Sequence, residues 1–110
     1  MMKNTMNNDS QYISEQVQRT LKVISVMAGR EVQGISPSEL AKIAQTSPAN
    51  ITRIMANLKQ ASFAERLPSD PNRWRLAPKL VQIANSVSLN LNQAQLQLQQ
   101  DQQNYSLLAI

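Results

Sequence analysis

Apolar residues recur at helical spacing in four stretches of this chain, and a polar cap or a proline marks where each stretch begins. The first stretch follows Ser14, a residue type that caps helices, and it ends at Gly29. Its expected inner face consists of Val17, Leu21, Ile24, Met27 and Ala28. The pattern predicts an amphipathic helix, followed by a loop over residues 29–34.

The second and third stretches both open with a serine followed by a proline. Ser36-Pro37 precedes Glu39, and these three residue types at this spacing form a capping box with proline in the first helical position. Ser47-Pro48 repeats the start signal, and the third helix is expected to run to about residue 60. The expected core residues are Leu40, Ala41, Ile43 and Ala44 on the second helix and Ile51, Ile54, Met55 and Leu58 on the third. Two short helices joined by a tight turn form a helix-turn-helix.

The outer face of the third helix carries small side chains and is rich in hydrogen-bonding groups. Ala49 and Ala56 keep the backbone accessible, and the remaining polar side chains offer donors and acceptors. Asparagine can pair with adenine, arginine with guanine, and a threonine methyl can contact the thymine methyl. This face therefore predicts a helix that reads the major groove, although this helix alone would also fit a surface that meets only water. The candidate DNA contacts are Ser47, Ala49, Asn50, Thr52, Arg53 and Asn57.

Two short strand patterns, residues 62–67 and 73–77, flank a turn-rich segment and predict a β-hairpin. On the second strand, Trp74 and Leu76 share the face expected to close the core. Arg73 and Arg75 share the other face, where Arg66 is expected to join them. A basic hairpin directly after a helix-turn-helix is a wing. Its arginines would contact phosphates or the minor groove, or would be solvated strand charges.

The start of the second helix offers a further candidate contact. Ser36 and Ser38 could meet phosphates together with free backbone N–H groups, although Ser36 is better explained as a cap.

The composition supports a polyanion partner and excludes several chemistries. The chain has a net charge of +4 and an isoelectric point near 9.9, which favours nucleic acid. It has neither cysteine nor histidine, so zinc–thiolate sites, thiol catalysis and histidine catalysis are excluded. No catalytic spacing is recognisable, so we expect no enzyme activity, cofactor or metal. No apolar run approaches the ~20 residues of a membrane span, and the polar start is no signal peptide, which predicts a cytoplasmic location.

Residues 78–110 predict a long helix that carries almost no charge. Pro78 opens it, and residues 85–110 are glutamine-rich with Asp101 as their one charged residue. A heptad pattern predicts a dimerising seam, although a disordered polar tail is the alternative. The seam consists of Ala84, Val87, Leu91, Ala94, Leu98, Asp101, Tyr105 and Leu108. The expected organisation is a flexible tail over residues 1–13, a DNA-binding domain over 14–84 and a C-terminal helix over 85–110.

The chain from residue 14 to about residue 87 resembles the N-terminal DNA-binding domain of IclR-type bacterial transcriptional regulators; a MarR-type winged helix is similar. The motifs that carry the resemblance are ISPSELAKIA, SPANITRIMANL, SFAER and WRLAPKLVQIA. It implies a mainly α fold with a β-hairpin wing, a winged helix-turn-helix that is followed here by the long helix. Gln45, Thr46 and Ser62 depart from the family pattern, in which Gln45 and Ser62 are glycines. A non-glycine residue in a left-handed conformation costs about 1 kcal/mol, so we expect these two turns to be built differently.

The resemblance implies a regulator that binds double-stranded DNA in the bacterial or phage nucleoid. We expect a homodimeric repressor that acts by occlusion, while roles in activation, replication or transposition stay open. The family's effector domain has no counterpart in this sequence, so no small-molecule effector is expected. The competing interpretation is a protein-interaction adaptor or antirepressor that docks through its apolar tail.

Overall fold

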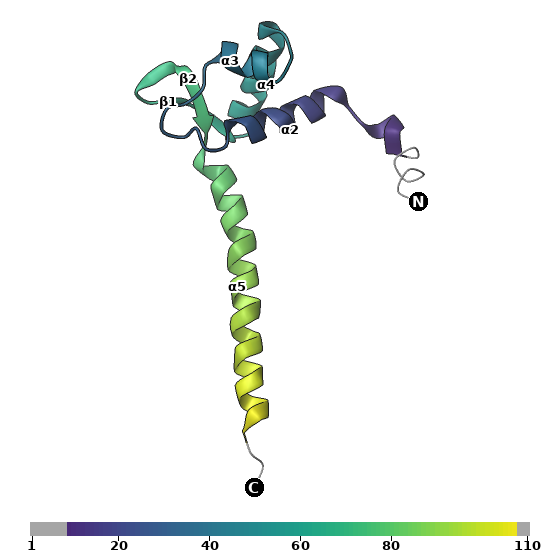
Figure 1. Ribbon diagram of the computed structural model, residues 1–110, viewed down its shortest axis with the longest axis vertical. Helices are drawn as coiled ribbons and strands as arrows, with labels where there is room; N and C mark the ends of the chain where they lie inside the picture. The colour runs from purple at the N-terminus through teal and green to yellow at the C-terminus, as the bar shows by residue number, and fades with distance from the viewer. Residues whose placement is uncertain (1–8, 108–110) are drawn as a thin grey trace. The chain divides into compact units, whose positions relative to one another are not determined.

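The computed structural model describes residues 9–107. Its elements are η1 (Ser10–Tyr12), α2 (Glu15–Met27), α3 (Pro37–Ile43), α4 (Pro48–Gln60), β1 (Ala64–Leu67), β2 (Asp70–Leu76) and α5 (Pro78–Ser106). Figure 1 shows them along the chain. The predicted fold class is confirmed, because short helices and a two-stranded antiparallel hairpin are followed by one long helix. The chain divides into two units, of which one ends at Ala77 and the other begins at Pro78.

Three predicted caps start the helices of the first unit. The side chain of Ser14 accepts a hydrogen bond from the backbone N–H of Val17 (3.2 Å), and that of Ser47 accepts one from Asn50 (3.1 Å). The Ser36 side chain accepts from the N–H of Glu39, whose carboxylate accepts from the Ser36 N–H in turn. This reciprocal pair is the predicted capping box. Each cap satisfies an N–H that has no partner within its own helix.

The core lies where α3 and α4 pack together, as the apolar pattern of these two helices predicted. The buried residues on them are Leu40, Ala41, Ala44, Ile51, Ile54, Met55 and Leu58. Ile43 was predicted to be part of this core, but 41% of its surface is exposed. The seven-residue α3 ends at Ile43. Within this helix and its C-cap, only Leu40, Ala41 and Ala44 are buried.

The predicted inner face of α2 is wrong in its N-terminal half. Val17 and Leu21 are 54% and 52% exposed, whereas Val23 and Met27 are fully buried. Apolar residues occupy two adjacent faces of this helix, and helical spacing does not reveal which of them meets the core. The helix contacts α3 and β2 through the face that carries Val23 and Met27.

The hairpin is joined to the helix-turn-helix by a third extended segment. β1 and β2 pair with Arg66 opposite Trp74, and a bulge follows before the two-residue turn. Ile35 and Trp74 exchange two backbone hydrogen bonds of 2.9 Å, so the residue just before the α3 cap adds to the sheet. Trp74 is 5% exposed and belongs to the core, as predicted. The wing is thereby anchored at the start of α3.

The expectation of differently built turns after α3 and α4 is wrong. Gln45 has φ 57° and Ser62 has φ 64°, so both non-glycine residues adopt the left-handed conformation. The N–H of Thr46 donates to the carbonyl of Ala41 (3.0 Å), and that of Phe63 donates to the carbonyl of Leu58 (2.8 Å). These are the long-range bonds of Schellman motifs. Both turns keep the backbone geometry expected of a glycine, and a residue with a side chain is strained in that geometry.

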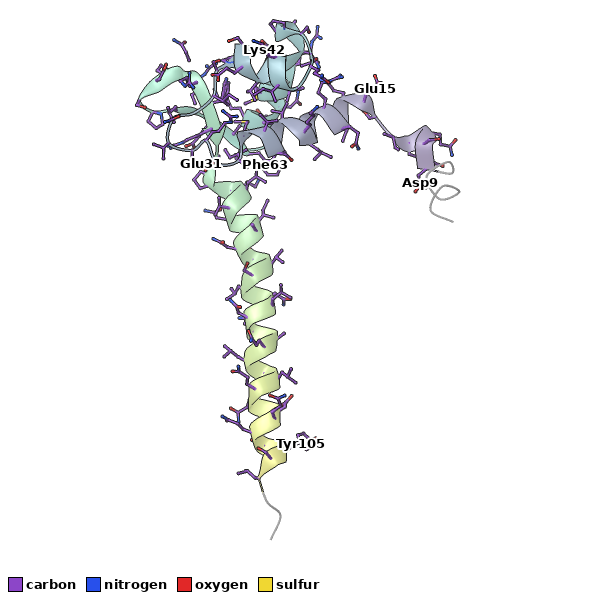
Figure 2. The ribbon with its side chains drawn as sticks, viewed as in Figure 1. Asp9, Glu15, Glu31, Lys42, Phe63 and Tyr105 are labelled. Carbon is purple, nitrogen blue, oxygen red and sulfur yellow. The ribbon has the colours of Figure 1, made fainter. Side chains whose placement is uncertain are left out.

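The long helix α5 exposes nearly all of its side chains within the described residues. It holds no buried residue over its 29 positions, and Figure 2 shows side chains projecting from both sides of the helix as far as Tyr105. The described seam residues lie on one face, and Leu108 lies outside the described residues. Over residues 9–107, no helix has the length and apolar character that crossing a membrane requires.

Candidate nucleic-acid interface

The outward face of α4 carries small side chains and an unpaired arginine. Ala49, Thr52, Arg53 and Asn57 are all exposed. The Thr52 hydroxyl donates to a carbonyl of its own helix, and the Asn57 amide donates to the carbonyl of Arg53 (2.8 Å). Among the described residues, the Arg53 guanidinium has no hydrogen-bond or ion-pair partner. The helix therefore presents an arginine with all five donors available.

Asn50 lies at the edge of this face and is already occupied. Its amide nitrogen donates to Gln16 (3.1 Å) and to the Thr46 hydroxyl (2.8 Å), and its oxygen accepts from the Gln16 amide (2.8 Å). Asn50 was predicted to read a base. The structure places its side chain between α2 and α4 instead, where a bidentate contact with adenine requires the pair with Gln16 to open.

A groove of about 270 Å³ runs between α4 and the wing. Its lining residues are Pro37, Ile51, Thr52, Met55, Ala56, Lys59, Arg66 and Trp74. Lys59 and Arg66 contribute positive charge from opposite walls, and Lys59 has no side-chain partner within the described part of the chain. The groove thus continues the face of α4 toward the hairpin, and its mostly apolar lining includes these two cations.

The prediction that Arg66 shares a face with Arg73 and Arg75 is wrong. Arg66 stands opposite Trp74 in the hairpin register, and its guanidinium lies 4.5 Å from the centre of the indole ring. The guanidinium also donates to the carbonyl of Pro71 (2.8 Å). A bulge between Arg66 and Leu67 shifts the register of the hairpin. Simple alternation along the two strands therefore does not predict the face on which Arg66 lies. Arg66 remains exposed in this stacked position.

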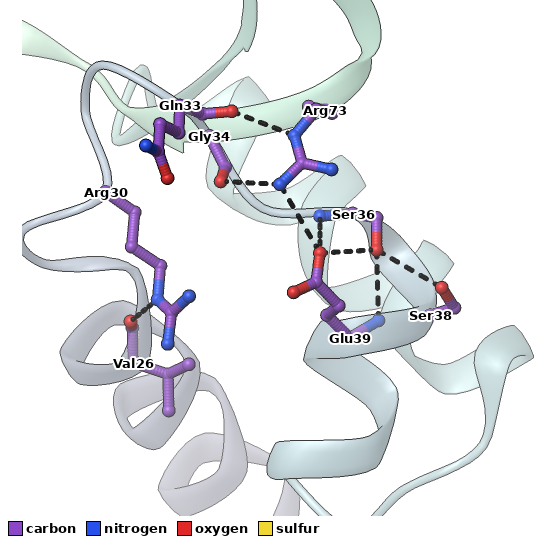
Figure 3. Close-up of polar contacts among 8 residues, drawn as sticks. All are labelled: Val26, Arg30, Gln33, Gly34, Ser36, Ser38, Glu39 and Arg73. Carbon is purple, nitrogen blue, oxygen red and sulfur yellow. Dashed lines mark hydrogen bonds and ion pairs between the residues drawn. The ribbon is translucent and has the colours of Figure 1, made fainter.

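The other two wing arginines are held by acidic partners. Arg75 binds Glu65 on the paired strand at 2.6 and 2.7 Å. Arg73 donates to the carbonyls of Gln33 and Gly34 at 2.8 and 3.1 Å, and it reaches Glu39 at 3.4 Å (Figure 3). The contacts of Arg73 fasten the wing to the loop before α3, and the pair of Arg75 with Glu65 joins the two strands of the wing. They also neutralise much of the charge that the sequence placed on the wing.

Glu39 is the centre of the contacts in Figure 3. The pKa of its carboxyl is lowered, first by the hydrogen bonds from the backbone and side chain of Ser36, and then by the charges of Arg73 and Arg30. The Ser36 hydroxyl also lies 3.2 Å from that of Ser38. Ser36 is thus used as a cap, whereas Ser38 is exposed at the start of α3.

Sequence reasoning missed two residues at this surface. Gln16 gave no signal, because its contact with Asn50 joins positions 34 residues apart. Lys59 could have been found, because it follows Thr52 and Ala56 on one side of the helix at spacings of four and three. Over the described residues, no cluster of acidic side chains is arranged to hold a metal ion.

The comparisons with known proteins support the fold. No family's sequence profile and no curated protein matches the chain. A crystal structure of a protein assigned to the IclR transcriptional regulators, from Silicibacter sp. TM1040, is similar over 67% of this chain with 22% identity and a TM-score of 0.59. The match spans 28% of that protein's length. A mutant of MepR from S. aureus is similar over 96% of this chain and 83% of its own, with 15% identity and a TM-score of 0.48.

The chain has the winged helix-turn-helix fold, as the resemblance to IclR-type DNA-binding domains predicted. In this arrangement α3 and α4 form the helix-turn-helix and the β1–β2 hairpin forms the wing.

Proposed function

We propose that the protein is a sequence-specific regulator that binds double-stranded DNA through α4 and the adjoining groove. The observation that carries this proposal is the unpaired Arg53 on the low, exposed face of a helix with a serine cap. An arginine with five free donors can engage the two acceptors of guanine in the major groove. Small neighbours such as Ala49 and Ala56 allow the helix to approach the base edges.

Base preference rests on the side chains next to Arg53. The Thr52 methyl can contact thymine, and Asn57 keeps its amide oxygen available as an acceptor. Asn50 acts first as a positioning residue, because its contacts with Gln16 and Thr46 fix the start of α4. Ser47 contributes as the cap of the helix.

Phosphate contacts come from the groove and from the start of α3. Lys59 and Arg66 supply charge beside α4, and Ser38 is exposed in the first turn of α3, where its hydroxyl can donate to a phosphate. Arg73 and Arg75 contribute mainly by holding the wing in place. Affinity should therefore fall as salt rises, because each neutralised phosphate releases counterions.

The protein acts in this proposal as a homodimer that represses by occlusion. The exposed apolar seam of α5 supports pairing with a second copy, and two copies can contact two half-sites. The seam residues that belong to the proposed interface are Val87, Leu91, Ala94, Leu98, Tyr105 and Leu108. No cofactor, membrane or small-molecule effector enters the proposal.

The test is selection from a random duplex pool by the purified protein, repeated with Arg53→Ala and Arg53→Lys across a salt series. The wild type should enrich a motif. Arg53→Ala should weaken binding to it by about 1–3 kcal/mol, roughly five- to 150-fold, and relax one position of the motif. Arg53→Lys should keep most of the affinity and relax the same position, because lysine keeps the charge without the bidentate geometry.

Lys59→Ala provides the matched control for a phosphate contact. It should weaken all sequences about equally and reduce the slope of log affinity against log salt by about 1. Binding that is indifferent to Arg53, with no enriched motif, would reject the proposal. That outcome would favour the adaptor, a second candidate supported by the exposed Val17 and Leu21 on α2.

A further inference from the structure

The heptad seam of α5 carries large apolar side chains that are exposed along the helix. Val87, Leu91 and Leu98 are each 58–64% exposed, and α5 holds no buried residue. Lys79 and Asp101 are its only charged residues, so it lacks the regular ion pairs that support isolated helices. Most helical stability in proteins comes from packing of an apolar face, and this helix has such a face without a partner element.

We propose that α5 pairs antiparallel with α5 of a second copy. This inference rests on the dimer in the proposed function and specifies its geometry. The pairing sets Leu91 opposite the partner's Ala94 and Val87 opposite the partner's Leu98. Further out, it sets Ala84 opposite the partner's Asp101 and Leu80 opposite the partner's Tyr105.

The sizes of the seam residues favour this orientation. In a parallel pair in register, each seam residue faces its own copy, so Ala84 and Ala94 each form a layer of two small side chains. Leu91 and Leu98 would form layers of two large ones. The antiparallel register places each of these alanines opposite a larger side chain. Layers of more even volume leave fewer voids, and each void costs contact energy.

The position of Asp101 favours the same orientation. A parallel pair would hold two Asp101 carboxylates across one layer of the seam, where like charges repel. Asp101 accepts a hydrogen bond from Gln97 of its own helix (3.0 Å), which does not neutralise its charge. In the antiparallel pair Asp101 meets Ala84, and no second charge lies in that layer.

An antiparallel pair shifted by one heptad in either direction would be less favourable than the proposed register. One shift would set Ala84 against Ala94, and the other would set Asp101 against Leu91. The proposed register avoids both contacts.

Disulfide trapping tests this arrangement directly, because the full chain contains no cysteine. Val87→Cys and Leu98→Cys are purified separately, then oxidised alone and as an equimolar mixture. Antiparallel pairing should give a mixed disulfide as the main product of the mixture, with little homodimer from either variant alone. The two positions lie about 16 Å apart along one helix, beyond the Cα separation that a disulfide spans.

The opposite pattern, with each variant linking to itself and no mixed product, would establish parallel pairing and overturn the inference while leaving a homodimer intact. Leu96→Cys is the control on the other side of α5 and should link in neither arrangement. A protein that sediments as a monomer at the same concentration would overturn the inference together with the dimer of the proposed function. DNA selection with the Arg53 variants still judges DNA binding separately.

Asp101→Asn gives a second measurement that does not depend on oxidation. In the antiparallel pair it should change the dimer dissociation constant by less than about threefold, because no charge faces Asp101. Tightening by more than tenfold would mean that two carboxylates face each other, and would overturn the inference.

Discussion

Asn50 and Gln16 bind each other through both amide groups, with hydrogen bonds of 2.8 and 3.1 Å across a separation of 34 residues. The pair joins the first turn of α2 to the first turn of the proposed DNA-reading helix, and Thr46 completes the hydrogen bonding of Asn50. Asn50 has a side chain suited to read a base, and the same side chain also fixes the start of α4.

We predict that Gln16→Ala and Asn50→Ala each destabilise the protein and that their effects overlap. The shared hydrogen bonds should give a coupling free energy of about 0.5–1 kcal/mol in urea unfolding of the two single variants and the double variant. Asn57→Ala, which removes a bond within α4 only, should show no coupling with Gln16→Ala. Additive effects of Gln16→Ala and Asn50→Ala would contradict the contact.

The left-handed Gln45 and Ser62 predict two stabilising substitutions. Gln45→Gly and Ser62→Gly should each raise the free energy of unfolding by about 0.5–1 kcal/mol. Relief of the left-handed strain should exceed the extra entropy of glycine in the unfolded chain. Gln60→Gly, within α4, is the control and should lower stability by about 0.5–1 kcal/mol. Chemical denaturation of the three variants checks the signs, and a loss of stability in Gln45→Gly would refute the assignment of its turn.

Replacement by alanine should lower the free energy of unfolding more at Gly34 than at Gly29. Both have positive φ, but a Cβ on Gly34 would lie 3.0 Å from the carbonyl oxygen of Trp74 and 3.1 Å from the Cβ of Arg73. A Cβ on Gly29 would meet nothing within 4 Å. Gly29→Ala should therefore cost about 1 kcal/mol, from backbone strain, and Gly34→Ala at least about 2 kcal/mol. Equal thermal shifts for the two variants would argue against the close approach of the loop to β2.

The capping box predicts a pH-dependent contribution from Glu39. Its pKa is lowered from 4.5 on folding, chiefly by Ser36, so the folded state prefers the ionised carboxylate. This contribution to stability is present above pH 4.5 and is lost as the pH falls through the lower pKa of the folded state. Wild type should be more stable than Glu39→Gln at pH 7, and the difference should shrink steadily below pH 4.5. A difference that stays constant to pH 2.5 in urea titrations would contradict this role.

The local sequence was sufficient to predict the helix starts and the inner face of α4. Ser14, Ser36 and Ser47 cap helices because a serine side chain reaches an N–H only three residues away, and such contacts depend on neighbouring residues alone. The wing could be placed for the same reason, since its turn residues lie between two short strand patterns. Trp74 was correctly assigned to the core.

The sequence did not reveal which contacts would occupy the predicted site residues. Asn50, Arg66, Arg73 and Arg75 all suit DNA, yet each is held by a group of this chain. Their partners come from other elements or from across the hairpin, and a bulge sets the face on which Arg66 lies. The Arg53 guanidinium is available for DNA, as the sequence suggested, because no acidic side chain of another described element reaches it.

The sequence alone determined the order of the elements and the caps of α2, α3 and α4, because these depend on spacing within one segment. Only the tertiary structure decided which face of α2 is buried, how the wing arginines are neutralised and that Gln16 supports Asn50. These features depend on distances between segments far apart in the chain, and helical or strand periodicity carries no information about such distances.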